Sequence, residues 1–480
     1  MGVLTFSDSD YPFWFISLVL RRAKQNTEDF GIFPKVLHRG HKRKTRVLSE
    51  MPDPVIHHIE LCVFDAEKTL NRLKKFGFNL FAKKQTAFCK QLVARLNTVI
   101  FLITEKNVHY KKENSESKKN FGEEIRSHKT EPLTLCCDHS PHVDTVFNLA
   151  LNVKRNDVKD IYERVCKEGG QIIPPTEISD ENGTVQYSIV KSKCGNVIHT
   201  LLNIDDYNGE FLPGFEILDS CQSTSKRDLN ICGIDHVTLA SYSGHSEKVI
   251  NFYEKCFRMN RFKITSNDDE TNGLIISEGV GLRLRAMEYW RCSETGLSYR
   301  NEESNQNNSF LLVVVESLEG QTNCNVEEFL RHHRGEGIEH IAFKCNNIIE
   351  TVSKLKSNGV VFRNPPTAYY DELRNLNKMS GLGVDLNRLS QYGILIDNED
   401  DSTDKSPEKK YLMQIFAKPL FDLKTFFIEI IERSGARGLG SGNILALVRS
   451  IREEERRNKM KSEAKTQEII KENFTSPRQC

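Results

Sequence analysis

The chain has 480 residues, which is enough for two or three domains with a sizeable core. Its 67 lysines and arginines nearly balance its 66 aspartates and glutamates, so the net charge of +1 gives no basic excess for binding nucleic acid or an anionic membrane. Mean hydropathy is -0.48 and no run of 18 apolar residues occurs, so no membrane-spanning helix is expected. The 13 cysteines include no C-x-x-C pair, which predicts reduced thiols in an intracellular compartment.

The first 51 residues lack the pattern of a folded segment. The apolar run 11–20 is preceded by Asp8 and Asp10, whereas a secretory signal has positive charge there. The stretch 21–46 carries nine basic residues against two acidic ones, which is compatible with a mitochondrial presequence. Because Met51 directly precedes the first folded-looking segment, residues 1–51 are interpreted either as a targeting segment or as a non-native start.

A strand-and-helix pattern then recurs four times along the chain. Each copy begins with a run that alternates apolar and polar residues, as in a half-buried strand, and continues with apolar residues at helical spacing. Further strand-like runs follow each helix, so each copy is predicted to form a βαβββ module. The four starting strands are expected at residues 55–63, 147–153, 234–241 and 338–345.

The four modules form two pairs, which predicts an α+β fold. The first domain is placed at residues 52–204 and the second at 232–434, with a linker at 205–231. Residues 435–480 are predicted to begin as a helix and to end in a charged tail. Charged insertions near 111–129, 293–308 and 398–410 are interpreted as solvated loops.

The corresponding position of the four starting strands holds His58, Asn148, His236 and His340. In a ring of paired repeats, the side chains of His236 and His340 are expected to share one cavity. Two neutral imidazoles and one carboxylate form the facial donor set of non-haem Fe(II) oxygenases. The positions that this set leaves open on the metal suit a chelating 2-oxo acid and O2.

Spacing alone does not choose the carboxylate. In the last strand of the second pair, Glu429 shares one face with Phe427 and Ile431, whereas Glu432 lies on the other face. A carboxylate between apolar residues is costly unless it is paired or binds a cation, which favours Glu429 as the third ligand. No acid stands out in the first domain, which is therefore predicted to bind no metal. Three histidines of that domain are interpreted as structural: His57, His58 and His199.

The motifs GIDHVTLA, GEGIEHIAFK, PPTAYYDEL, YLMQIFAKPLF and TFFIEIIERSGARGLGSGN occur in this order in the second pair. Together they resemble the 4-hydroxyphenylpyruvate dioxygenase family of the vicinal oxygen chelate superfamily. The match runs from about Pro54 to Arg457, and GEFLPGF and GNILAL look most like the dioxygenase-like branch. The resemblance implies two glyoxalase-like open-barrel domains, of which the second is catalytic.

The same resemblance implies site residues. Fe(II) is the implied cofactor, held by the three residues chosen above. The family's pocket glutamine falls on Gln414, and two of its pocket aromatics fall on Phe416 and Phe427. The helix after Gly442 corresponds to one that covers the site in the family.

Five positions depart from the family pattern. Glu339 stands where the family usually has glutamine, and an added carboxylate beside the metal alters the local charge. Leu284 and Val315 stand for a serine and an asparagine of the dioxygenase pocket, while Ile444 and Val448 stand for phenylalanines of the C-terminal helix. We therefore expect these departures to affect metal binding little. They are expected to weaken or relocate the polar contacts with the substrate and to change the product.

These features predict conversion of 4-hydroxyphenylpyruvate into 4-hydroxymandelate with loss of CO2, towards ubiquinone headgroup synthesis in the mitochondrion. A dioxygenase that makes homogentisate in tyrosine catabolism is the first alternative, and a non-catalytic binding protein on the same fold is the second. The expected partners are an aromatic 2-oxo acid and O2, without nucleic acid, and a homodimer is considered. The cytoplasm is the alternative location.

Overall fold

The structure is a computed structural model. It describes residues 54–106, 143–218, 229–265, 268–269, 271–276, 281–289, 310–320, 325–375, 382–398 and 410–444, together with positions 456 and 460. These residues belong to one compact unit that spans Met51–Cys480. The predicted extension 1–51, nearly all of the three charged loops and most of the predicted C-terminal helix lie outside the described residues.

Residues 54–218 form the first half of this unit, a sheet with the strand order β6-β7-β8-β5-β1-β4-β3-β2-β9. Helix α2 (Ala66–Lys75) follows β1 and helix α4 (Arg155–Lys167) follows β5. The strands are β1 (Val55–Val63), β2 (Asn79–Gln85), β3 (Cys89–Leu96), β4 (Val99–Lys106), β5 (Thr145–Asn152), β6 (Thr176–Asp180), β7 (Gly183–Lys191), β8 (Ile198–Asn203) and β9 (Glu216–Ile217).

Residues 229–434 form the second half, a sheet with the order β11-β13-β14-β10-β15-β18-β17-β16, in which β12 pairs with β13. The strands are β10 (Ile231–Ser241), β11 (Asn260–Phe262), β12 (Leu274–Ile276), β13 (Leu282–Glu288), β14 (Leu311–Ser317), β15 (Gly337–Cys345), β16 (Leu395–Asn398), β17 (Tyr411–Phe416) and β18 (Phe427–Ser434). The helices are α5 (Ser246–Phe252), the π-helix η2 (Tyr253–Phe257), α6 (Asn325–His333), α7 (Ile348–Ser357), α8 (Thr367–Asn375) and α9 (Leu386–Tyr392).

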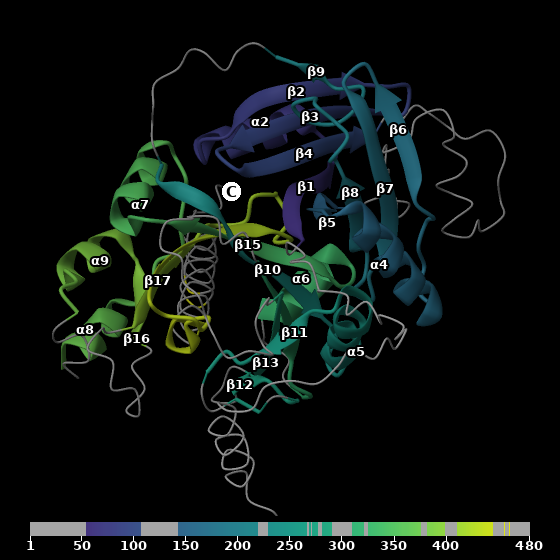
Figure 1. Cartoon of the computed structure of the whole chain (residues 1–480). Helices are drawn as coiled ribbons and strands as arrows, with labels where there is room; N and C mark the ends of the chain where they lie inside the picture. Colours follow the sequence, from purple (N-terminus) through teal and green to yellow (C-terminus); the bar gives the residue numbers. More distant parts are fainter. Residues whose placement is uncertain are drawn as a thin grey trace, which may run out of the picture. The chain divides into compact units, whose positions relative to one another are not determined.

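This element order confirms the predicted α+β fold of four βαβββ modules, to which the second half adds further helices (Figure 1). The predicted linker 205–231 contributes a short strand, β9, which pairs with β2. The domain boundaries themselves remain predictions. No helix in the described part of the chain has the length and apolar character needed to span a bilayer.

Two of the four helices that follow the starting strands, α2 and α7, begin at a side-chain cap, whereas α4 and α5 have none. The Asp65 side chain accepts a hydrogen bond from the Lys68 amide at the start of α2, and Asn347 accepts one from the Glu350 amide at the start of α7. Such side chains satisfy amides that have no partner within the helix. Each helix then buries one apolar stripe against its sheet.

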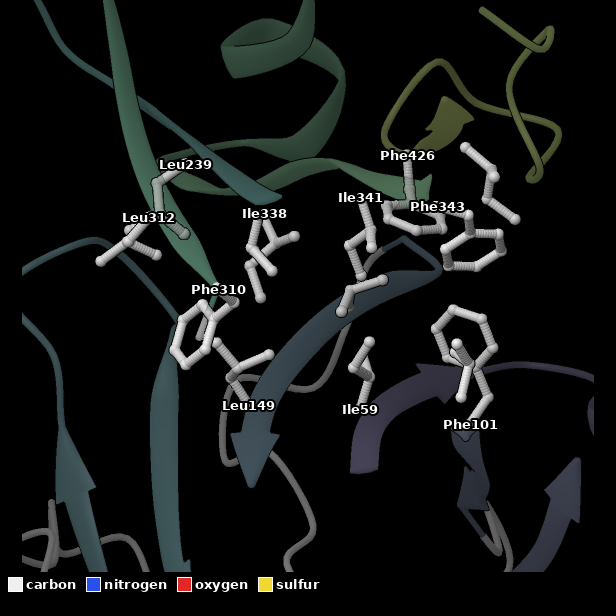
Figure 2. Packing of buried hydrophobic residues seen from close by; sticks show 14 of the residues in the cluster. Ile59, Phe101, Leu149, Leu239, Phe310, Leu312, Ile338, Ile341, Phe343 and Phe426 are labelled. Carbon is white, nitrogen blue, oxygen red and sulfur yellow. The ribbon is translucent and has the colours of Figure 1, made fainter. Parts of the chain in front are cut away.

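The two halves pack against each other through a shared core. Figure 2 shows Ile59 and Leu149 of the first sheet facing Ile338 and Ile341 of the second. Interdigitated aliphatic and aromatic side chains of this kind remove a large apolar area from water. The strands that start the modules, β1, β5, β10 and β15, are therefore held in place by this core.

The central strands share one register. His58 lies opposite Ala150 in the first half, and His236 lies opposite Ala342 in the second. In each half, the pairing skips one residue before each candidate ligand position, which is a β-bulge. The skipped residues are His57, Phe147, Asp235 and Glu339.

Candidate metal centre and substrate pocket

The structure brings His236, His340 and Glu429 together. They lie on β10, β15 and β18, which are adjacent strands of the second sheet. One ligand atom of each residue lies within 4.8 Å of the others. The Nε2 atoms of both histidines lie 3.5 Å from the same oxygen, Oε2 of Glu429. No second group of this kind occurs among the described residues, which include the three histidines interpreted as structural.

Asp235 and Glu339, the bulge residues next to the two histidines, fix the orientation of the imidazoles. Nδ1 of His236 lies 2.8 Å from a carboxylate oxygen of Asp235, and Nδ1 of His340 lies 3.1 Å from one of Glu339. A carboxylate that accepts the Nδ1 proton leaves Nε2 as the lone pair that can bind a metal. Both Nε2 atoms therefore serve as candidate ligands at one point.

Arg433 completes this arrangement on one side. Its guanidinium donates two hydrogen bonds to Asp235, at 2.7 and 2.8 Å. Burial alone raises the pKa of the Asp235 carboxyl, but the charge and hydrogen bonds of Arg433 hold that pKa well below its usual range. Asp235 is therefore a fixed anion, whereas Glu339 has no arginine or lysine partner in the described part of the chain.

The opposite side of the cluster is held by an amide network. Gln414 donates a hydrogen bond of 2.8 Å to Oε1 of Glu429, and its own carbonyl accepts one of 3.0 Å from Asn443. Asn443 in turn accepts a hydrogen bond from the Tyr369 hydroxyl. This chain of contacts leaves Oε2 of Glu429 directed at the histidines.

The chemistry of this donor set fits a divalent cation. Glu429 is 1% exposed, and a carboxylate so deeply buried requires positive charge nearby. Burial lowers the pKa of His236, but the Glu429 and Asp235 carboxylates outweigh it and raise the pKa to about 9. The cluster thus stabilises positive charge at its centre, and two imidazoles with one carboxylate suit non-haem iron.

A pocket opens over the cluster, and the predicted substrate residues line it. Gln414, Phe416 and Phe427 all contribute to its wall. The Phe427 ring stacks on the His340 ring at 4.6 Å between centroids, and the Phe416 ring lies 6.3 Å from that of Phe427. Four of the five departures from the family pattern also line the pocket: Leu284, Val315, Glu339 and Ile444. The fifth, Val448, lies outside the described residues.

Three residues of the site were not singled out from the sequence. Arg433 offered a signal, because it alternates with Glu429 and Ile431 on one face of β18. Asp235 offered no such signal. Strict alternation would place Asp235 on the opposite face of β10 from His236, and only the bulge brings its carboxylate beside the imidazole. The amide of Asn443 reaches the site from beyond the last strand, which no local pattern predicts.

The fold agrees with what the chain is similar to. Residues 233–377 match the Glyoxalase/Bleomycin resistance protein/Dioxygenase superfamily. The 4-hydroxyphenylpyruvate dioxygenase-like protein of Rattus norvegicus is 31% identical over 79% of this chain and 91% of its own length. The 4-hydroxyphenylpyruvate dioxygenase of Dictyostelium discoideum is 33% identical over 66% of this chain and 80% of its own length. The chain belongs to the 4-hydroxyphenylpyruvate dioxygenase family.

Solved structures support the same fold for this family member. A mutant of 4-hydroxymandelate synthase from Streptomyces coelicolor superposes with a TM-score of 0.60. The two sequences are 22% identical, and the match covers 84% of this chain and 100% of the synthase chain. The resemblance inferred from the sequence motifs is thereby confirmed at the level of family and fold.

Proposed function

We propose that this protein is an Fe(II)-dependent oxygenase that converts 4-hydroxyphenylpyruvate into 4-hydroxymandelate with loss of CO2. The observation that carries the proposal is the cluster of His236, His340 and Glu429 at the pocket floor. Bound Fe(II) would supply the activation of O2 that oxidative decarboxylation of a 2-oxo acid requires. The family membership supports this class of reaction.

The chain's own residues prepare the site in three ways. Asp235 and Glu339 hold the Nδ1 protons of the two histidines, so that Nε2 is free to bind the metal. Gln414 holds one oxygen of Glu429 and thereby orients the other. Phe427, stacked on His340, would shield a bound metal from water on that side and offers a surface for an aromatic ring.

The choice of product rests on the pocket wall. Leu284 and Val315 give it an apolar character that differs from the polar pocket expected of a homogentisate-forming dioxygenase. A shifted ring would favour oxidation at the benzylic carbon instead of the ring. One structural relative carries the name 4-hydroxymandelate synthase, which is consistent with this direction. Supply of a ubiquinone headgroup precursor in the mitochondrion is part of the proposal, supported by the basic stretch 21–46.

The test is a product analysis with a matched pair of variants. Protein loaded with Fe(II) is mixed with 4-hydroxyphenylpyruvate in air, and the products are separated by chromatography against standards. Separation is needed because 4-hydroxymandelate and homogentisate have the same mass. His236→Ala should lose both bound iron and product, whereas His58→Ala, at the corresponding position of the first half, should keep both.

Each outcome assigns a different function. 4-Hydroxymandelate supports the proposal, and homogentisate assigns the ordinary dioxygenase reaction. Bound iron and bound 2-oxo acid without any oxidised product would overturn the catalytic proposal in favour of a binding protein on this fold. Iron retained by His236→Ala would show that the metal lies elsewhere.

A further inference from the structure

One wall of the substrate pocket is formed by apolar side chains of β13 and β14. Leu284 and Val315 are cross-strand partners with exposed fractions of 6% and 5%. Leu282 and Val313 line the pocket from the same two strands. All four belong to a buried cluster that also includes Phe329 of α6, so the wall is continuous. The side chains of this wall offer a ligand no hydrogen bond.

Polar side chains on the far side of the metal cluster already have partners. Gln414 donates to Glu429 and accepts from Asn443, which uses both ends of its amide group. Arg363 lines the pocket at the end of β17, where its backbone amide donates to the carbonyl of Phe416, and it takes part in a further interaction within the protein. These groups lie across β10, β15 and β18 from the apolar wall, because the strand order separates β17 from β13 and β14.

The remaining polar side chains of the pocket lie beside the histidines or at α6. Thr238 and Glu339 lie beside His340 of β15. Glu328 of α6 pairs with Lys424 at 2.6 Å, and the Lys424 side chain is 46% exposed. Asn325 precedes Glu328 by one helical turn and Phe329 by four residues, and it lines the pocket with both. The four strand residues of the wall itself carry no polar side-chain group.

The first half shows that polar residues fit at the positions of this wall. Strands β3 and β4 take the places of β13 and β14 relative to the central strand. Gln91 and Thr104 are cross-strand partners there, as Leu284 and Val315 are in the second half. The Gln91 amide donates a hydrogen bond of 3.1 Å to the Thr104 hydroxyl, although both side chains are almost fully buried. The apolar pair is therefore not imposed by the backbone.

From these observations we infer that the pocket selects the aryl group of its 2-oxo acid by apolar contact, so that a ring hydroxyl weakens binding. This inference rests on the proposed function and refines its substrate, because it makes an arylpyruvate without the ring hydroxyl a better ligand of the same site than 4-hydroxyphenylpyruvate. A hydroxyl buried against an apolar wall gives up its hydrogen bonds to water without replacement. We expect an arylpyruvate without the hydroxyl to bind roughly 10- to 100-fold more tightly than 4-hydroxyphenylpyruvate, which is the range over which apolar pockets reject hydroxylated analogues.

The test compares three ligands on the Fe(II)-loaded protein. Phenylpyruvate, 4-methylphenylpyruvate and 4-hydroxyphenylpyruvate are titrated without O2 in a calorimeter, and kcat/KM is then measured from O2 uptake. The methyl compound is the control for size, because its methyl group has about the volume of a hydroxyl but forms no hydrogen bond. The two apolar ligands should bind more tightly than the hydroxylated one in both measurements.

A double variant provides the matched control in the protein. Leu284→Gln with Val315→Thr installs the pair that Gln91 and Thr104 form in the first half. It should shift the preference toward 4-hydroxyphenylpyruvate by about 10-fold or more. Val315→Thr alone, which preserves shape, should shift it in the same direction if the double variant does not fold.

The outcomes separate this inference from the proposed function. If 4-hydroxyphenylpyruvate binds most tightly to the unaltered protein, the inference fails while the oxygenase proposal stands. Loss of that preference in Asn325→Ala would then identify the residue that recognises the hydroxyl. If none of the three ligands binds, the proposed function fails and the inference with it.

Discussion

The two halves of the molecule have the same strand order and register, yet only the second offers a donor set for a metal. The candidate ligands there are His236, His340 and Glu429. By register, the corresponding residues of the first half are His58, Asn148 and Thr200. The backbone therefore brings three side chains together in both halves, and the identity of those side chains alone decides whether the position can bind a metal.

In the first half, the corresponding position is closed by a hydrogen-bond network. Glu60 accepts a hydrogen bond of 2.7 Å from Thr104 on one oxygen and one of 3.0 Å from Asn148 on the other. Asn148 also donates to Thr200 at 2.9 Å. A buried network whose members satisfy one another fixes the core, and its amide and hydroxyl groups are weaker ligands for a cation than imidazoles. The second half instead leaves three donor atoms facing one another.

The largest expected effect comes from moving one residue of the first half into the second. His340→Asn places at the ligand position of β15 the amide that Asn148 provides in β5. An amide oxygen is a much weaker ligand for iron than an imidazole, so metal affinity should fall by more than about 100-fold and activity should disappear. Metal content after loading and gel filtration measures this.

The control for that variant is His332→Asn on α6, which lies outside the candidate metal cluster and should keep its iron. Stoichiometric iron in His340→Asn would contradict the assignment of this position as a ligand. Circular dichroism of both variants checks that the fold is retained.

The second-largest expected effect is a loss of stability when the buried hydrogen-bond network around Glu60 is broken. Asn148→Ala removes a donor from the buried Glu60 carboxylate, which should lower the free energy of unfolding by roughly 3 kcal/mol. Because the network belongs to the half without the metal, iron content and substrate turnover should not change. Urea unfolding curves measure the loss, and Asn152→Ala on the same strand should cost much less because that side chain is partly exposed. A loss of iron in Asn148→Ala would show that the halves are not independent.

Much of this comparison could be predicted from the sequence. The period-2 pattern identified the four starting strands, and their alignment placed Asn148 and the histidines at one position. Alternation also separated Glu429 from Glu432, whose carboxylate accepts a hydrogen bond from the Ile348 amide of α7 and lies away from the cluster. Local periodicity carries this information because it depends only on which face of a strand is buried.

The bulges and the long-range contacts could not be predicted. Asp235 and Glu339 are each skipped in the pairing of β10 with β15, and this brings their carboxylates beside the histidines that follow them. No pattern in the sequence predicts these two bulges. The partner of Asp235 is Arg433, which is 198 positions away in the chain. Such contacts follow from the closure of the sheet, and they become visible only when the strand order is known.

The asymmetry between the two bulge carboxylates leads to a smaller prediction. Arg433→Met removes the guanidinium that fixes Asp235, and should weaken metal binding by about 10- to 100-fold, as is usual for residues that orient metal ligands. Glu339→Gln keeps an acceptor for Nδ1 of His340 and should change metal affinity only a few-fold. Competition with a chelator of known affinity measures both. Tighter metal binding in Arg433→Met together with weaker binding in Glu339→Gln would show that charge near the metal matters more than orientation.

The smallest expected effect is a pH dependence that belongs to the first half. His199 of β8 is buried there, with its ring nitrogens at the carbonyl of Leu149 and the hydroxyl of Tyr253. Burial lowers the pKa of His199 to about 4, although the hydrogen bond to Leu149 acts in the opposite direction. Since the unfolded chain takes up this proton near pH 6.5, it binds more protons than the folded chain below that pH. Stability is therefore lost as the pH falls from about 6.5 towards 4.

Between pH 7 and pH 5.5, this histidine should cost the protein about 1 kcal/mol of stability. His199→Gln cannot take up the proton, so its unfolding free energy should fall by about that much less over the same interval, whatever its value at pH 7. Urea unfolding of both proteins at the two pH values measures the difference. His236 of the second half provides the contrast, because burial lowers its pKa but the Glu429 and Asp235 carboxylates favour its protonated form and raise that pKa to about 9. Equal pH dependence of the two proteins would mean that His199 keeps an ordinary pKa in the folded state.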